Sequence, residues 1–132
     1  MTLPPSLIGV GNPYLKWDID KDFPFAVWHN NGVIICPGAI VTVNVTLGRH
    51  VHLNLNATVG HDSTIGDYTT VSPGAAVSGN VTIGKRCYIG TGAVIIEKIN
   101  ICDDVIIGAG AVVVKHITES GTYVGVPAKK IK

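Results

Sequence analysis

A strict six-residue repeat runs through the sequence from Ile35 to about Thr118. Every sixth residue is Ile, Leu or Val at fourteen consecutive register positions, namely Ile35, Val41, Leu47, Leu53, Val59, Ile65, Val71, Val77, Ile83, Ile89, Ile95, Ile101, Ile107 and Val113. Four residues after each of them stands a small or aliphatic residue, such as Val45 or Ala57. Neither a helix nor a simple alternating strand has a period of six, whereas stacked hexapeptide β-helices do. The repeat therefore predicts an all-β, parallel β-helix with its aliphatic side chains pointing inward.

Each hexad is expected to form a short strand followed by a corner at its third and fourth places. Gly, Asn or Asp occupies the fourth place in nine of the fourteen hexads, as at Gly38, Asn56 and Asp62. These residues tolerate the left-handed backbone angles that tight corners demand. Three hexads then make a triangular coil of eighteen residues, and the repeat supplies between four and five coils.

The eighteen-residue period also predicts which residues stack at each corner of the prism. The three expected columns are Val43, His61, Gly79 and Glu97; Leu55, Pro73, Thr91 and Ala109; and Arg49, Asp67, Lys85 and Asp103. This stacking holds as long as no coil contains an insertion.

The segments on either side of the repeat have a different character, which divides the chain into 1–32, 33–118 and 119–132. Residues 1–32 contain both Trp, both Phe and four of the seven Pro, without a six-residue register. We expect them to cap the open end of the solenoid or to contact neighbouring subunits. The tail at 119–132 ends in Lys129, Lys130 and Lys132, which fits either a solvated end or contact with an anionic ligand.

Composition excludes several classes of function. The net charge of +1 gives no electrostatic basis for nucleic-acid binding. The sequence has no apolar run long enough to span a bilayer and no signal-like N-terminus, so we expect a cytoplasmic protein without a membrane partner. The three cysteines lack CxxC spacing, and their odd number fits a reducing compartment. We expect Cys87 to pack inside as a small hydrophobe.

Several motifs together resemble a known enzyme family. They are the stretch NLNATVGHDSTIGDYTTVSPGAAVSGNVTIG, the following YIGTGAVI and IIGAGAVVVK, and the closing YVGVPAKKI. They look like the left-handed β-helix acyltransferases, and in particular the sugar O- and N-acetyltransferases of the sialic acid NeuD and bacillosamine-pathway PglD type. The resemblance implies a left-handed coil, a homotrimer, and acetyl-CoA in the groove between neighbouring β-helices. Those enzymes carry an N-terminal sugar-nucleotide domain, of which LIGVGNPYLKWDIDKDFPFAVWHNNG looks like a remnant too short for a nucleotide site.

The expected chemistry centres on the Gly-His-Asp tripeptide. Acetyl transfer from a thioester to an amine or hydroxyl needs a base near the acceptor and hydrogen-bond donors for the developing oxyanion, but no metal. His61 stands at a corner, so its imidazole should project outward as the general base. By resemblance, Asp62 raises the basicity of His61, and a carboxylate bonded to one ring nitrogen would also fix the tautomer. Asn54 and Asn56 are weaker candidates for orienting the acceptor.

The resemblance also places acetyl-CoA contacts at Thr70, Gly79, Thr91 and Ala109. Thr70 stands where the resembled enzymes can have His. Gly79 lies one coil beyond His61, where a missing side chain would let the thioester approach. Because Gly79 and Thr91 fall on two different corners, a trimer groove that uses one corner from each subunit explains the set better than a single chain does. Lys129 or Lys130 is a candidate for the CoA phosphates.

Two other functions remain open from the sequence. A γ-type zinc carbonic anhydrase shares the fold, and His50, His52 and His61 are possible zinc ligands, but the His-x4-His spacing of that family is missing. A catalytically silent β-helix that binds a ligand or partner is the second alternative, because a fold does not imply a function. The acceptor, the choice between O- and N-acetylation, and the acyl chain length cannot be read from the residues.

Overall fold

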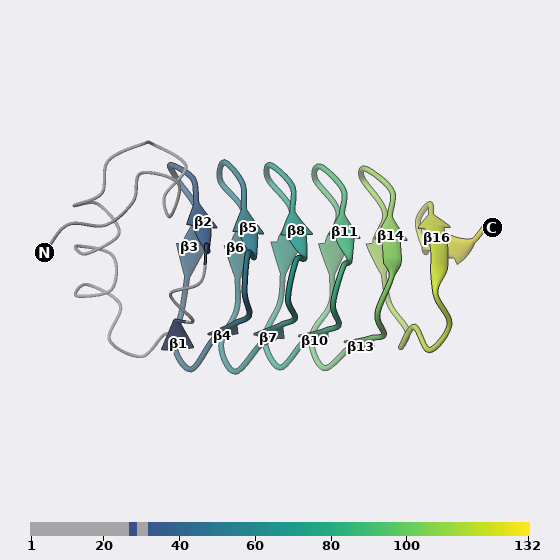
Figure 1. Cartoon of the computed structure of the whole chain (residues 1–132). Coiled ribbons are helices and arrows are strands. Elements are labelled where there is room, and N and C mark those ends of the chain that lie inside the picture. Colours follow the sequence, from purple (N-terminus) through teal and green to yellow (C-terminus); the bar gives the residue numbers. More distant parts are fainter. Residues whose placement is uncertain (1–26, 29–31) are drawn as a thin grey trace, which may run out of the picture.

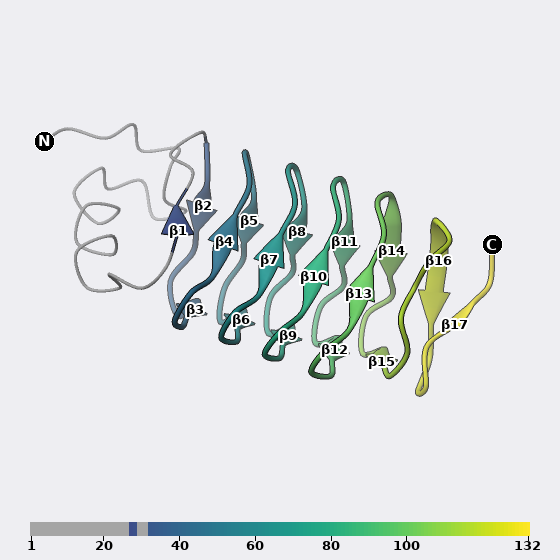
Figure 2. The ribbon, with the colours of Figure 1, turned by 90° about the horizontal axis from the view of Figure 1, so that it is seen from below.

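The computed structural model describes residues 27–28 and 32–132, and over these residues the chain winds into a solenoid of stacked coils (Figure 1). The successive coils follow the sequence along the axis, from β1 at one end to the C-terminal hairpin at the other (Figures 1 and 2). The expected cap at 1–32 lies almost entirely outside the described residues. In the described part of the chain, no helix has the length and the apolar stretch that crossing a bilayer requires.

Three β-sheets form the sides of the solenoid. Sheet A consists of β1 (Val27–Trp28), β4 (Thr46–Leu47), β7 (Thr64–Ile65), β10 (Thr82–Ile83) and β13 (Asn100–Ile101). Sheet B consists of β2 (Ile34–Ile35), β5 (His52–Leu53), β8 (Thr70–Val71), β11 (Tyr88–Ile89), β14 (Val105–Ile107), β16 (Gly121–Val124) and β17 (Lys129–Lys130). Sheet C consists of β3 (Ile40–Val41), β6 (Thr58–Val59), β9 (Ala76–Val77), β12 (Val94–Ile95) and β15 (Val112–Val113).

The strands pair in parallel with the eighteen-residue register that the repeat predicts. Thr58, for example, pairs with Ala76, and Ala76 pairs with Val94. The register changes only at the ends: Val27 pairs with Thr46, nineteen residues on, and Val105 with Gly121, sixteen residues on. The last coil is therefore shorter, and β16 then turns back through the antiparallel strand β17. Paired strands extend beyond the expected boundaries 33–118 at both ends of the repeat.

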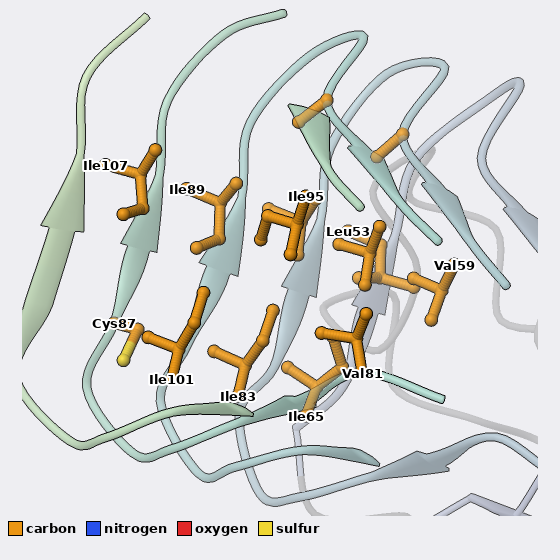
Figure 3. Packing of buried hydrophobic residues seen from close by; sticks show 14 of the residues in the cluster. Leu53, Val59, Ile65, Val81, Ile83, Cys87, Ile89, Ile95, Ile101 and Ile107 are labelled. Atoms are coloured by element: carbon orange, nitrogen blue, oxygen red, sulfur yellow. The ribbon is translucent and has the colours of Figure 1, made fainter. Parts of the chain in front are cut away.

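The aliphatic register positions form the core, as predicted. All fourteen are buried, and Figure 3 shows several of them pointing from the three sheets into the interior. Burial of each such side chain contributes roughly 1.5–3 kcal/mol. Ser63 and Thr69 are also fully buried, and their hydroxyls donate to the carbonyls of Ser78 and Gly84. Cys87 is 2% exposed, which confirms its expected place in the core.

The corners are more regular in the structure than in the sequence. All thirteen fourth-place residues from position 38 to position 110 have positive φ angles near those of the left-handed region. Four of them, His50, Tyr68, Arg86 and Lys98, are not Gly, Asn or Asp. A side chain in this conformation costs roughly 1–2 kcal/mol. Partners in the next coil offset part of this cost at three of the four: His50 stacks on Tyr68, and Arg86 pairs with an aspartate.

Candidate active site

His61 and Asp62 lie at the corner between β6 and β7, which joins sheet C to sheet A. We call this column of corner residues the site corner; it comprises Val43-Asn44, His61-Asp62, Gly79-Asn80 and Glu97-Lys98. The His61 Nδ1 and the Asp62 Oδ2 are 2.9 Å apart. Asp62 is the fourth-place residue of this corner and has a φ of 57°. The two side chains are 55% and 47% exposed, so both are accessible to a ligand.

This contact determines which nitrogen of His61 can act as a base. An ionised carboxylate only accepts hydrogen bonds, so Nδ1 donates its proton to Asp62. The neutral ring then has its lone pair on Nε2. Hydrogen bonding to His61 first, and to the side chain of Asn44 second, lowers the pKa of Asp62 below its ordinary value of 3.8. Asp62 is therefore ionised at neutral pH, as this role requires.

Gly79 lies directly under the His61 ring, one coil further along the site corner. A Cβ built on Gly79 would lie 2.7 Å from the Cε1 and 2.8 Å from the Cδ2 of the ring, and it would also collide with Nε2. Real carbon contacts are not this short, so any side chain at position 79 would displace the imidazole. The space that the sequence assigned to an approaching thioester is thus partly filled by the histidine itself.

The backbone N–H of Gly79 is the third-place amide of the next coil at the site corner. At the corner between sheets A and B, the equivalent third-place amides of Arg49 and Lys85 donate to Asp67 and Asp103 over 2.8 Å and 2.7 Å. Among the described residues, the Gly79 N–H has no such acceptor. An amide free in this way can stabilise a developing oxyanion.

The other sequence-predicted residues lie away from His61 within one chain. Thr91 and Ala109 are exposed at the corner between sheets B and C, where the Gly110 N–H donates to the Thr91 carbonyl. Asn56 belongs to the same corner, and its side chain lies over Gly38.

Two further candidates belong to sheet B or its edge. Thr70 lies on the outer face of β8, and the Asn54 Oδ1 accepts a hydrogen bond from the Leu55 N–H over 2.8 Å. One chain therefore brings together His61, Asp62 and Gly79, whereas the remaining candidates lie on the far side of sheet C or on sheet B.

A pocket of about 290 Å³ lies between the last coil and the C-terminal hairpin. Its lining includes Lys115, His116, Tyr123, Lys129 and Lys130. Lys115 follows β15 where Glu97 follows β12, so this pocket continues the site corner about 14 Å beyond His61, given three strand spacings of roughly 4.8 Å. Lys130 is engaged by Glu119 through a 2.6 Å ion pair. Sequence reasoning found the lysines of the tail but missed Lys115 and the pocket.

The histidines considered as zinc ligands lie apart from one another. His50 lies at the corner between sheets A and B, His52 on the face of sheet B, and His61 at the site corner. The His52 Nε2 is 3.4 Å from the Cys36 Sγ, and burial lowers the pKa of His52. Within residues 32–132, no group of three or more His, Cys, Asp or Glu side chains is placed to hold a metal ion.

Comparison with known proteins agrees with this architecture. Residues 80–115 match the family described as bacterial transferase hexapeptide (six repeats). No curated protein sequence matches the chain significantly.

Several solved structures share the fold. The acetyltransferase domain of PglB from Neisseria gonorrhoeae is 36% identical over 82% of this chain and 52% of its own, with a TM-score of 0.78. WeeI from Acinetobacter baumannii is 41% identical over 76% of this chain and 50% of its own, with a TM-score of 0.73. PerB from Caulobacter crescentus, solved with CoA and GDP-perosamine, is 30% identical over 91% of this chain and 65% of its own, with a TM-score of 0.59.

The chain spans about half the length of the first two of these structures. The matched repeats and the shared fold together show a hexapeptide-repeat parallel β-helix that is similar to these acetyltransferases.

Proposed function

We propose that the protein is an acetyl-CoA-dependent acetyltransferase that acts on an amine or hydroxyl of a small, sugar-related acceptor. The observation that carries the proposal is the His61 ring, held by Asp62 through Nδ1 and seated over Gly79, with Nε2 available as a base. The PglB domain that resembles this chain has been solved in complex with acetyl coenzyme A, which supports the same donor here. The cytoplasm, where acetyl-CoA is available, is the proposed location.

The residues of the site corner suggest a direct transfer. Nε2 of His61 removes the proton from the acceptor while the acceptor nitrogen or oxygen attacks the thioester carbonyl carbon. The Gly79 N–H donates to the oxyanion of the tetrahedral intermediate. Collapse of the intermediate breaks the carbon–sulfur bond, and the imidazolium returns its proton to the departing thiolate. Asp62 stabilises the imidazolium throughout.

We further propose that the active unit is a homotrimer with its site between chains. The His61 and Asp62 side chains are 55% and 47% exposed and do not line the 290 Å³ pocket, so a neighbouring chain would supply a wall against which a substrate could be held. Thr91, Ala109 and Asn56 belong to another corner. They can serve the same site only if that corner of one chain faces the site corner of its neighbour.

Lys129 is the better of the two tail lysines for contacting the CoA phosphates. It lines the pocket at the end of the site corner, and none of the described carboxylates forms an ion pair with it. Lys130, by contrast, is held by Glu119. The pantetheine arm of CoA joins the thiol to the phosphates. His61 and the pocket lie along the same corner, so the arm could lie along that corner between them.

A thiol-release assay tests the proposal. Purified protein is given acetyl-CoA and a panel of amino sugars, nucleotide-linked amino sugars, sialic acids and simple amines. With an acceptor identified, His61→Ala should reduce kcat by at least about 100-fold, the usual minimum for loss of a general base. His50→Asn is the matched control, because Asn tolerates the left-handed backbone of position 50 and the residue lies at another corner.

Three results would contradict parts of this proposal. Wild-type turnover in His61→Ala would remove the assigned base. Absence of both CoA binding and thiol release with every acceptor would favour the non-catalytic alternative. A monomer in analytical ultracentrifugation would exclude a site shared between chains.

A further inference from the structure

Cys36 and His52 bring a thiol and an imidazole together on sheet B, away from the site corner. Ile34 in β2 pairs with His52 in β5, and Cys36 directly follows β2. The Cys36 Sγ and the His52 Nε2 are 3.4 Å apart, which is within hydrogen-bond distance for sulfur, and both residues are partly buried. In the part of the chain that the structure describes, no third His, Cys, Asp or Glu completes a metal site with them. The pair is therefore a thiol beside a base.

Both groups of this pair are uncharged at neutral pH. Burial raises the pKa of Cys36 above its ordinary value of 9.0 and lowers the pKa of His52 below its ordinary value of 6.5. The thiol can donate its proton to the lone pair of a neutral imidazole nitrogen. The thiolate is the nucleophilic form of cysteine, and an adjacent base can generate it during the attack. His52 can thus activate Cys36 when an electrophile is present.

The other two cysteines lack this arrangement. Cys87 is 2% exposed, and its thiol donates to the backbone carbonyl of Cys102 over 3.2 Å. Cys102 is partly buried, as Cys36 is, but no histidine of the described residues forms a hydrogen bond with its thiol. Cys102 and Cys87 can therefore serve as internal references for the reactivity of Cys36.

We propose that Cys36 is a second acyl-accepting site, at which acetyl-CoA transfers its acetyl group to the protein itself. His52 removes the thiol proton through Nε2 while the Cys36 Sγ attacks the thioester carbonyl carbon. A carbon–sulfur bond to Cys36 forms, the bond to the CoA sulfur breaks, and the imidazolium returns its proton to the CoA thiolate. The products are S-acetylated Cys36 and free CoA, so no oxidant or further reactant is needed. The inference rests on the proposed donor, acetyl-CoA, and not on His61.

The repeat supplies conservative substitutions for both residues. His52 pairs with Thr70, which holds the equivalent place one coil further. Position 72, two coils beyond Cys36, is Ser. His52→Thr and Cys36→Ser therefore introduce residue types that the same fold already accepts at equivalent places. His52→Thr removes the base and keeps the thiol, whereas Cys36→Ser removes the thiol.

Peptide mass spectrometry tests the proposal on the full chain, incubated with acetyl-CoA and without an acceptor. We expect acetylation of Cys36 at least about tenfold faster than that of Cys102, a fraction of the 10²–10⁴ that a general base can contribute, and none at Cys87. Neutral hydroxylamine should remove the label, because it is a thioester. In His52→Thr, the rate at Cys36 should fall to about that of Cys102. Unfolding cannot cause this fall, since it would expose the thiol and raise its reactivity.

His61→Ala separates this site from the proposed transfer to a small acceptor. Labelling of Cys36 should continue in that variant, and in Cys36→Ser the labelled peptide should be lost. Equal rates at Cys36 and Cys102, or an unchanged rate in His52→Thr, would overturn the acyl-accepting role and leave the proposed function standing. If Cys36 is labelled but no acceptor is acetylated by the wild-type protein, the proposed function fails and the role of Cys36 stands.

Discussion

The two corners on either side of sheet A have the same left-handed backbone conformation but carry side chains that make different contacts. The ladder corner, between sheets A and B, comprises Arg49-His50, Asp67-Tyr68, Lys85-Arg86 and Asp103-Asp104. Its charges alternate from coil to coil: the Arg49 Nε and Nη2 donate to the Asp67 Oδ2, and Arg86 donates to both oxygens of Asp104. At the site corner, His61 has a glycine beneath it and bonds to the aspartate beside it in the sequence.

The difference shows how a repetitive fold can hold a reactive group. The left-handed turn is the same at both corners, with φ values of 57° at Asp62 and 61° at Tyr68. At the ladder corner, each ionic pair joins adjacent coils, so the side chains add to stability. At the site corner, the histidine pairs within its own turn, and the next coil offers Gly79, so one ring nitrogen stays available for chemistry.

Filling the space under the ring should have the largest effect. Gly79→Ala introduces a Cβ into the position of the His61 ring, and displacement of a catalytic group by about 1 Å can cost about 100-fold in rate. We therefore expect kcat to fall by about that factor, with little change in the melting temperature, because Gly79 does not have a positive φ.

Glu97→Ala, one coil further on the same column, is the control and should retain wild-type kcat. Steady-state kinetics also separate two roles of the glycine. A higher KM for acetyl-CoA with a normal kcat in Gly79→Ala would mean that the glycine leaves space for the thioester to approach. It would then not be needed to keep the His61 ring in position.

The same substitution at the two corners should give opposite readouts. Asp62→Asn places an amide against Nδ1, and an amide that donates there stabilises the tautomer with its proton on Nε2. We expect kcat to fall about tenfold, less than for a buried aspartate because water can partly replace this exposed one. Asp67→Asn should leave kcat unchanged and lower the melting temperature, because it removes the partner of Arg49.

Kinetics and thermal melts on both variants measure this contrast. Equal losses of activity at the two corners would show that the ladder corner also supports the site, and the division between them would not hold.

In the pocket at the end of the site corner, we expect Lys129 to contact the CoA phosphates through its charge. Lys129→Glu should raise the KM for acetyl-CoA about fivefold to tenfold, since a favourable contact with phosphate becomes a repulsive one, while kcat changes little. Lys132→Glu makes the same charge change outside the lining of the pocket. An equal rise in both variants would point to the general charge of the tail rather than to the pocket.

The sequence predicted the parts of the fold that depend on repetition. The register of six identified every inward aliphatic position from Ile35 to Val113, because a buried column tolerates only apolar side chains. The period of eighteen also predicted Gly79 next to His61, since backbone stacking follows from counting residues. The last coil departs from this count because Ile117 pairs with Ile101 after sixteen residues, and a local shortening leaves no signal in the repeat.

Contacts between side chains were less accessible from the sequence. The 2.9 Å contact between His61 and Asp62 was expected only by resemblance, because it depends on the direction in which a left-handed turn aims a side chain. His50 and Tyr68 are not among the residue types, Gly, Asn and Asp, that mark these turns in the sequence. Their ring stacking offsets part of the cost of the left-handed backbone, so the turns form without those residue types. Thr70 and Asn54 lie on or beside sheet B in one chain, and the resemblance that named them gave no position relative to His61.

The smallest expected effect concerns the acid stability of the ladder corner. Hydrogen bonding to Arg49 lowers the pKa of Asp67 below its ordinary value of 3.8, and Arg86 does the same for Asp104. A carboxyl group whose pKa is lower in the folded state stabilises the fold above pH 3.8, and this contribution is lost as the pH falls through the folded-state value. The melting temperature should therefore fall modestly between about pH 4 and pH 2, since exposed ion pairs contribute little. Asp67→Asn lacks one of the two titrating groups, so its melting temperature should change less over the same range, measured by circular dichroism at constant ionic strength. An equally steep fall in wild type and variant would show that the pair of Arg49 and Asp67 does not contribute to the acid sensitivity.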